Sequence, residues 1–204
     1  MILLPTHNKP LSFKRFVTQY QQTGATQKAC VIMEHSDVGL YDSIAYPHHW
    51  ITVVLDGGKG AATHMNRIFD MFPDEDYYAY LADDVFPITD EWDIKLRDSC
   101  IQHGMAYAKD GYHNQTFACH GFLSGKVVRA VGCLNPFGFD HYGFDNFWFH
   151  ACKDANRIKY YNDVFLRHDQ EPKPNKWQHD TVKLEQVRNG AEWNGYINRL
   201  RQLA

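Results

Sequence analysis

Continuous apolar runs and amphipathic segments alternate along the first hundred residues. Apolar runs open the segments at residues 1–5, 29–37, 50–60 and 77–84, and each segment then turns polar or glycine-rich. Between these segments lie stretches with apolar side chains at helical spacing, namely 11–24, 61–72 and 91–104. Runs that are continuous rather than alternating are typical of strands buried on both faces of a parallel sheet. The pattern predicts an α/β fold, with a central, mostly parallel sheet flanked by helices.

The second half of the chain is less regular. We expect short strands within 105–109 and 117–122, a helix within 124–134, a loop running into a helix near Asp145, and a strand within 158–170. Residues 180–203 predict one broken helix, with the break near Gly190 or Gly195. The chain shows no internal repeat and no clear linker. We therefore expect one domain over residues 1–175, with a C-terminal helical extension over residues 176–204 packed on it.

Composition narrows the class of protein. The 204 residues are 44% hydrophobic and 22% charged, with a net charge of -3, which is typical of a globular chain and disfavours a strongly basic nucleic-acid surface. No apolar stretch approaches the length of a signal peptide or a membrane helix, so we expect a cytoplasmic protein, in the host cytoplasm if the chain is viral. The five cysteines form no CxxC pair, which indicates reduced core thiols rather than a cysteine zinc site.

Polar residues follow each of the four apolar runs. They read PTHN, EHSD, DGGKG and ADD in chain order. Ligands of parallel sheets bind outside the carboxyl ends of the strands, so one site would gather all four. The adjacent carboxylates Asp83 and Asp84 suit Mg²⁺ or Mn²⁺. The glycine-rich turn before a helix suits phosphate, although neither a Walker motif nor a GxGxxG fingerprint is present.

Five stretches, in this order, resemble a known enzyme family. They are LLPTHNKP, LDGGKGAATHMNRIF, YLADDVFP, GFDHYGFDNFWFHACK and VFLRHDQ, which together extend over residues 1 to about 170. Their order and spacing resemble the nucleotide-sugar glycosyltransferases of GT-A fold, close to the family 2 type, including compact bacteriophage members. One departure is visible, because Ala82 stands where the first acid of the family's DxD motif would be.

The resemblance implies a metal-dependent sugar transfer from a nucleoside-diphosphate sugar. A divalent cation, Mn²⁺ or Mg²⁺, would bridge Asp84, His168 and the donor diphosphate. Asp145 would be the base of an inverting reaction. The residues that would bind the nucleotide donor are Pro5, Thr6, Asn8, Glu34, Gly58, Lys59, Gly60, Asn66 and Asp83. The acceptor would be a saccharide, or a hydroxylated base in phage DNA.

Other interpretations of the same residues stay open. Asp145 is also a suitable helix cap, Asp140 competes with it as the base, and His168 can be an ordinary strand-end histidine. Cys119 and His120 read as packed or solvated side chains. The strand-end acids would equally serve a metal-dependent nucleotidyltransferase or phosphohydrolase, and the aromatic content would serve a non-enzymatic carbohydrate-binding module. The donor sugar and the oligomeric state are not readable from the sequence.

Overall fold

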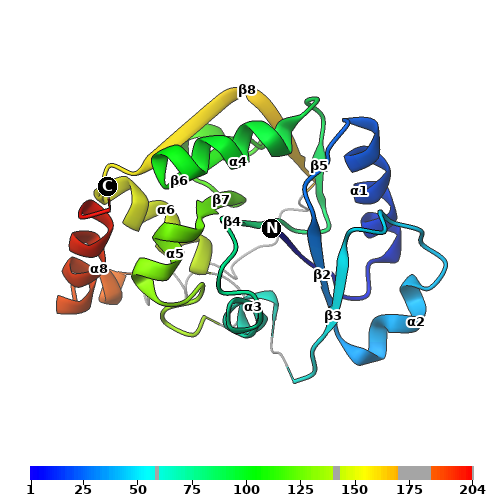
Figure 1. Ribbon diagram of the computed structural model, residues 1–204, viewed down its shortest axis with the longest axis horizontal. Coiled ribbons are helices and arrows are strands. Elements are labelled where there is room, and N and C mark those ends of the chain that lie inside the picture. The colour runs from blue at the N-terminus through cyan, green and yellow to red at the C-terminus, as the bar shows by residue number, and fades with distance from the viewer. Residues whose placement is uncertain (58–59, 140–142, 170–184, 204) are drawn as a thin grey trace.

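The computed structural model of the protein describes residues 1–57, 60–139, 143–169 and 185–203. One eight-stranded sheet forms the centre of this part of the chain, in the order β3-β2-β1-β4-β7-β6-β8-β5 (Figure 1). The strands are β1 (Ile2–Pro5), β2 (Ala29–Met33), β3 (Ile51–Val54), β4 (Tyr77–Tyr80), β5 (Val85–Pro87), β6 (Met105–Lys109), β7 (Gly121–Ser124) and β8 (Ile158–His168). The α-helices are α1 (Pro10–Gln22), α2 (Val38–Tyr41), α3 (Met65–Met71), α4 (Trp92–His103), α5 (Gly125–Val131), α6 (Phe144–Asp154) and α8 (Ala191–Arg201).

The sheet is mixed in strand direction. Strands β3, β2, β1 and β4 pair in parallel, and β6 pairs in parallel with β8. Strand β7 runs antiparallel to both of its neighbours, β4 and β6, and β5 runs antiparallel to β8. The predicted α/β class and the predicted central sheet with flanking helices are confirmed, with four of the seven described strand pairs parallel.

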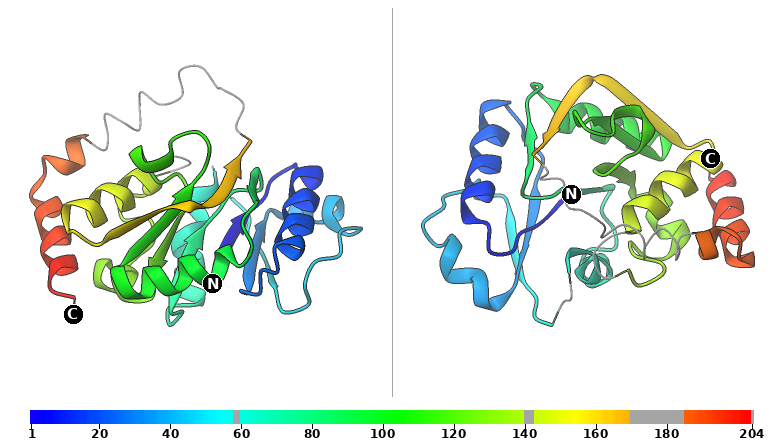
Figure 2. Two further views of the ribbon diagram at one scale, coloured as in Figure 1. Left: turned by 90° about the horizontal axis from the view of Figure 1, so that it is seen from above. Right: turned by 180° about the vertical axis from the view of Figure 1, so that it is seen from behind.

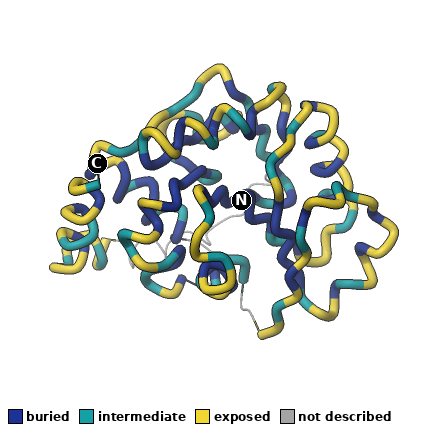
Figure 3. Tube along the Cα trace, viewed as in Figure 1, coloured by how far each residue is buried: buried dark blue, intermediate teal, exposed yellow. Residues whose placement is uncertain are grey.

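Two hydrophobic clusters cover the two faces of the sheet. Because side chains alternate along a strand, Leu3 packs into one cluster, while Ile2 and Leu4 pack into the other. The first cluster contains side chains of α3, α5, α6 and α8, and the second contains those of α1 and α4. Figure 3 shows the buried segments running along the strands, with exposed residues on the outer sides of the helices. Strands buried on both faces explain the continuous apolar runs of the sequence.

The C-terminal helix belongs to this packing. Trp193, Ile197 and Leu200 of α8 are buried in the first cluster, and α8 lies beside α6 at one end of the molecule (Figure 2). The helical break predicted near Gly190 is where α8 begins, after a short turn of helix from residue 185. The proposed domain boundary near residue 175 lies outside the described residues, so the division into 1–175 and 176–204 stays a prediction. No helix in the described part of the chain is long and apolar enough to cross a membrane.

Strand direction brings distant segments to one edge of the sheet. Strands β1, β2, β3, β4, β6 and β8 all end at this edge. Strand β7 begins there, because Gly121 pairs with Tyr80 near the end of β4 and with Tyr107 of β6. The residues after Pro5, Tyr80, Lys109 and His168 therefore meet those before Gly121, and this edge carries the candidate site.

Candidate active site

The loop after β1 is tied to the acids after β4. The Thr6 hydroxyl is buried and donates to Asp83 Oδ2 at 2.9 Å, and it also shares a 2.8 Å hydrogen bond with the Tyr41 hydroxyl. Asn8 adopts a left-handed backbone conformation with φ of 52°, which asparagine tolerates better than most residues. Its N–H donates to Asp37 Oδ2 at 3.2 Å, which fixes the course of the loop. The PTHN stretch thus lies at the site, as the sequence predicts.

The two adjacent acids share one cation but face different partners. The Lys9 ammonium lies 3.3 Å from Asp83 Oδ1 and 3.3 Å from Asp84 Oδ2. Burial raises the pKa of Asp83 above its ordinary value, in spite of Lys9 and the Thr6 hydrogen bond. Burial also acts on Asp84, but contacts with His168 and Lys9 outweigh it and hold the pKa of Asp84 well below its usual range. Asp84 is therefore ionised at neutral pH, which is the state that binds a hard cation.

His168 lies beside Asp84, and the family resemblance implies a shared metal ion for this pair. Val85 pairs with His168 in the β5–β8 ladder, and this register places the His168 side chain beside Asp84. His168 Nε2 lies 3.5 Å from Asp84 Oδ1, longer than a well-formed hydrogen bond. Asp84 Oδ1 and His168 Nδ1 are both buried, and neither has a hydrogen-bond partner among the described residues. The 3.5 Å separation of Asp84 Oδ1 and His168 Nε2, with no hydrogen-bond partner on Asp84 Oδ1 among the described residues, fits a divalent cation held between these two atoms.

Asp145 stands in the first turn of α6. Its Oδ1 accepts hydrogen bonds from the N–H groups of Gly143 at 3.1 Å and Asn146 at 2.8 Å. Burial outweighs these bonds and raises the pKa of Asp145 to about 6. Gly143 holds the helix cap position with φ of 96°, and a Cβ atom there would lie 2.6 Å from the Phe139 ring. The result is a carboxylate with a pKa close to neutral, the property expected of a general base.

Asp145 belongs to the same edge of the sheet. Burial, and then the charge of Asp145, raise the pKa of the Tyr80 hydroxyl and of the Cys119 thiol. The Phe144 ring packs against the Tyr80 ring, with 5.0 Å between centroids. The start of α6 therefore reaches the end of β4.

Of the remaining residues predicted to bind the donor, some lie near strand ends or turns, one is engaged elsewhere, and two lie outside the described residues. Pro5 ends β1, Glu34 follows β2 and is half-buried, and the Gly60 carbonyl accepts a hydrogen bond from the Thr63 N–H at 3.1 Å. Asn66 binds the backbone of Asn135 with both ends of its side chain, at 2.7 and 3.0 Å, so these groups are engaged in joining α3 to a loop. Gly58, Lys59 and the competing acid Asp140 lie outside the described residues.

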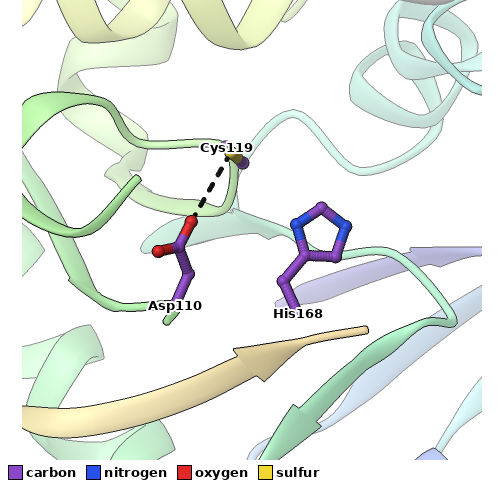
Figure 4. A group of neighbouring side chains, drawn as sticks. All are labelled: Asp110, Cys119 and His168. Carbon is purple, nitrogen blue, oxygen red and sulfur yellow. Dashed lines mark hydrogen bonds between the residues drawn. The ribbon is translucent and has the colours of Figure 1, made fainter. Parts of the chain in front are cut away.

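Several polar side chains at this edge were not predicted as site residues. Asp37 is buried, and one of its oxygens lies 2.7 Å from His7 Nδ1. Asp110 follows β6, and its Oδ2 lies 3.7 Å from Cys119 Sγ (Figure 4). The His120 ring lies 4.6 Å from the His168 ring, between centroids, and burial lowers the pKa of His120 to about 3. Asp110 could have been found from its position after a strand, as Asp83 was.

Comparisons with known proteins place the fold. No protein-family model and no curated protein matches the chain. Among solved structures, TarS of Staphylococcus aureus superimposes with a TM-score of 0.62 at 10% identity, over 100% of this chain and 43% of that one. A shorter TarS chain, residues 1–349 in complex with UDP, superimposes with a TM-score of 0.56 at 10% identity, over 98% and 68%.

Two further structures share the fold. The 4-diphosphocytidyl-2C-methyl-D-erythritol synthase of Anaerococcus prevotii has a TM-score of 0.56 at 8% identity, over 91% of this chain and 94% of that one. Rv0371C of Mycobacterium tuberculosis, in complex with manganese, has a TM-score of 0.55 at 8% identity, over 90% and 95%. The chain therefore has the GT-A-like, Rossmann-like fold that its motifs resemble. It spans less than half of the longer of these two TarS chains.

Proposed function

We propose that the chain is a metal-dependent glycosyltransferase that moves a sugar from a nucleoside-diphosphate sugar to an acceptor hydroxyl. The observation that carries the proposal is the meeting of Asp84 and His168 at the strand ends, where His168 Nε2 lies 3.5 Å from Asp84 Oδ1, a buried atom that lacks a hydrogen-bond partner in the described part of the chain. The TarS structure that shares this fold holds UDP, and the Rv0371C structure holds manganese. Both ligands are of the classes that the proposal requires.

Each residue then has a role that its surroundings suit. Asp84 and His168 would hold Mn²⁺ or Mg²⁺, which when bound neutralises the diphosphate leaving group. Asp145 would take the proton of the acceptor hydroxyl, and a pKa of about 6 leaves it ionised, yet basic, at neutral pH. If Asp145 deprotonates the acceptor hydroxyl and the acceptor oxygen attacks the sugar carbon directly, the configuration at that carbon is inverted.

The donor pocket would follow the ends of the parallel strands. Thr6 holds Asp83 in place by a hydrogen bond, which gives Asp83 a fixed orientation although Ala82 replaces the usual first acid. The other donor-binding residues in this proposal are Pro5, Asn8, Glu34, Gly58, Lys59, Gly60 and Asn66. The acceptor would be a saccharide or a hydroxylated base in phage DNA.

A second candidate function is nucleotidyl transfer. The observation that favours it is the likeness to the Anaerococcus prevotii synthase, which extends over 94% of that chain. The same strand-end acids would then bind a metal with a nucleoside triphosphate. The loop after β1 carries Lys9 but no glycine run, and it therefore lacks the basic glycine-rich sequence expected of a sugar nucleotidyltransferase.

Thermal unfolding with a panel of nucleotides tests both functions. A ligand that binds only the folded chain stabilises it by about 2.7 kcal/mol at a hundred times its dissociation constant. We expect UDP, GDP or CDP to raise the unfolding midpoint only when Mn²⁺ is present. Asp84→Asn should remove this increase, and Asp90→Asn, a change of an exposed acid nearby in sequence, should keep it.

The panel also separates the alternatives. Stabilisation by nucleoside triphosphates, with none by any diphosphate, would favour nucleotidyl transfer. Binding of a sugar alone, without nucleotide or metal, would favour a carbohydrate-binding module. Once a diphosphate is identified, release of that nucleotide from its sugar conjugates in the presence of an acceptor would establish the reaction.

A further inference from the structure

We propose that Asp110, Cys119 and His168 bind a zinc ion, at a position separate from the one between Asp84 and the donor diphosphate. One ligand atom from each of these three side chains lies within 4.8 Å of the other two. Figure 4 shows the three side chains facing one another, from the end of β6, the segment before β7 and the end of β8. The proposal does not depend on the sugar transfer.

The spacing is close to that of a tetrahedral zinc site. Zinc bonds of about 2.3 Å to sulfur and about 2.0–2.2 Å to nitrogen or oxygen separate the ligand atoms by roughly 3.3–3.8 Å. Asp110 Oδ2 and Cys119 Sγ are already 3.7 Å apart. Small side-chain rotations bring the third ligand to the same spacing, because all three atoms already lie within 4.8 Å.

The Asp110 carboxylate is held in the orientation that a ligand needs. Its Oδ1 accepts hydrogen bonds from three successive backbone N–H groups, at 2.7 to 2.8 Å, which leaves Oδ2 directed at Cys119. The backbone N–H of His168 donates to the backbone carbonyl of Asp110 at 3.0 Å, and this bond joins the ends of β6 and β8. Hydrogen bonds of this kind orient ligating carboxylates in metal sites.

The His168 ring supplies the independent sign of a ligand. Its side chain is only 7% exposed, and Nδ1 is buried without a hydrogen-bond partner among the described residues. A buried polar atom in this state is costly unless something binds it. On the other side of the ring, Nε2 faces Asp84 at 3.5 Å. A histidine that ligates zinc through one nitrogen commonly donates its other N–H to a carboxylate, so in the zinc-bound state Asp84 would hold the Mn²⁺ of the proposed function without His168.

His120 offers a fourth donor. Its Nε2 is also buried without a hydrogen-bond partner in the described part of the chain, and its ring lies 4.6 Å from that of His168, between centroids. A thiolate, a carboxylate and one or two imidazoles form a donor set that favours zinc over Mg²⁺ or Mn²⁺, which prefer oxygen. Zinc binding displaces the thiol proton to solvent and forms the zinc–sulfur bond. The ion would cross-link the segment from Asp110 to His120 to the end of β8.

Cobalt substitution tests the site without nucleotide or manganese. Co²⁺ added to the metal-free full chain should give visible d–d bands of a tetrahedral ion and a near-ultraviolet band from the thiolate, and equimolar Zn²⁺ should remove both. Cys119→Ser and Cys119→Ala should lose the near-ultraviolet band. Cys133→Ser, a change at another half-buried cysteine, should keep it. Asp110→Asn should weaken Co²⁺ binding at least tenfold.

Each outcome bears on the proposal. Absence of the near-ultraviolet band in the wild-type chain, or its persistence in both Cys119 variants, overturns it. Circular dichroism of each variant establishes that the fold is kept, and Zn²⁺ should raise the unfolding midpoint of the wild type but not of Cys119→Ser. The Mn²⁺-dependent nucleotide binding of Cys119→Ser is measured separately. If the cobalt band appears but no nucleotide binds, the zinc site is supported and the transferase proposal is rejected. If nucleotide binds with Mn²⁺ but the cobalt band is absent, only the zinc site is rejected.

Discussion

Lys9 places its ammonium beside the two strand-end acids that would attract a metal ion. Its ammonium lies 3.3 Å from an oxygen of each acid, Asp83 and Asp84, and its side chain is 46% exposed. In Lys9→Met this competing charge is absent, so Mn²⁺ should bind more tightly. Exposed ion pairs contribute about 0.2–1 kcal/mol each, and two of them correspond to roughly a tenfold increase in affinity.

Electron paramagnetic resonance of free Mn²⁺, titrated into the chain without nucleotide, measures this change. Lys14→Met removes an exposed lysine from α1 and serves as the control, with no change expected. Equal Mn²⁺ affinity in the wild type and Lys9→Met would show that the metal and the ammonium do not share the two acids.

The raised pKa of Asp145 should affect both the pH dependence of turnover and the pH dependence of the unfolding free energy. The pKa of about 6 in the folded chain lies above the ordinary value of 3.8, because of burial, so the folded state holds the proton more tightly than the unfolded state. The stabilisation from this proton is complete below pH 3.8 and is lost as the pH rises through about 6. At pH 7.5 the half-buried carboxylate therefore destabilises the fold, and Asn at this position should relieve that cost.

We expect Asp145→Asn to unfold at a higher temperature than the wild type at pH 7.5 and to be stabilised by about 1–2 kcal/mol, allowing for partial exposure. The difference should shrink as the pH falls through about 6 and should vanish only well below pH 3.8. If Asp145 is the base, turnover should fall by at least a hundredfold, and the wild-type rate should rise with pH through about 6. Full activity in this variant would remove Asp145 from the mechanism.

At the scale of elements, the sequence predicts the parallel part of the sheet and misses what depends on strand direction. The parallel strands could be recognised because each is a buried apolar run with polar residues after it. The rule that strands end at the site located Thr6, Asp83 and Asp84. It could not locate Cys119 or His120, because they precede β7, and only the antiparallel pairing of β7 brings its start to this edge.

Strand β5 shows the same limit. It has only three residues, Val85–Pro87, and it exists through its pairing with β8, far along the chain. That pairing sets His168 beside Asp84, so the resemblance indicated a contact that no local pattern could have shown. For Asn66, the sequence predicted the element but not the contact. Its place on a helix was predicted, but its bonds to Asn135 come from a loop that only the fold brings near.

The start of α5 requires a residue without a side chain. A Cβ atom on Gly125 would lie 2.0 Å from the Glu75 carbonyl oxygen, and the Gly125 N–H donates to the Asp76 carbonyl at 2.6 Å. Because the obstructing atom is backbone, Gly125→Ala should shift β4 against α5 and cost about 2–4 kcal/mol of unfolding free energy.

Gly39 supplies the matched control for this change. It lies within helix α2, and a Cβ atom there would meet nothing within 4 Å. Gly39→Ala should be neutral, or stabilising by up to about 1 kcal/mol, through the lower entropy of the unfolded chain. Urea unfolding of both variants measures the two effects, and equal stabilities would contradict the close approach of α5 to the loop before β4.

At the scale of the whole molecule, one edge of the sheet carries the candidate site, and helix α8 packs beside α5 and α6. The candidate site draws on residues from Thr6 to His168, so its geometry depends on the sheet as a unit. Helix α8 completes the cluster on one face, where the Trp193 ring packs 5.6 Å from the Phe147 ring, between centroids. The Trp193 Nε1–H donates to Asp154 Oδ2 at 3.2 Å. A helix held in this way should unfold together with the sheet.

Trp193→Ala tests whether the C-terminal extension and the sheet form one cooperative unit. Removing a buried tryptophan costs about 3–5 kcal/mol, and Glu192→Ala, one residue earlier on the exposed side of α8, should cost little. In urea, tryptophan fluorescence and far-ultraviolet circular dichroism should report one coincident transition for the wild type and a single transition at lower urea for Trp193→Ala. If α8 were a separate unit, Trp193→Ala would instead give an early helical transition and leave the main midpoint unchanged. Since the sheet holds the strand-end site, Mn²⁺-dependent nucleotide binding should weaken in Trp193→Ala only at urea concentrations that unfold the whole chain.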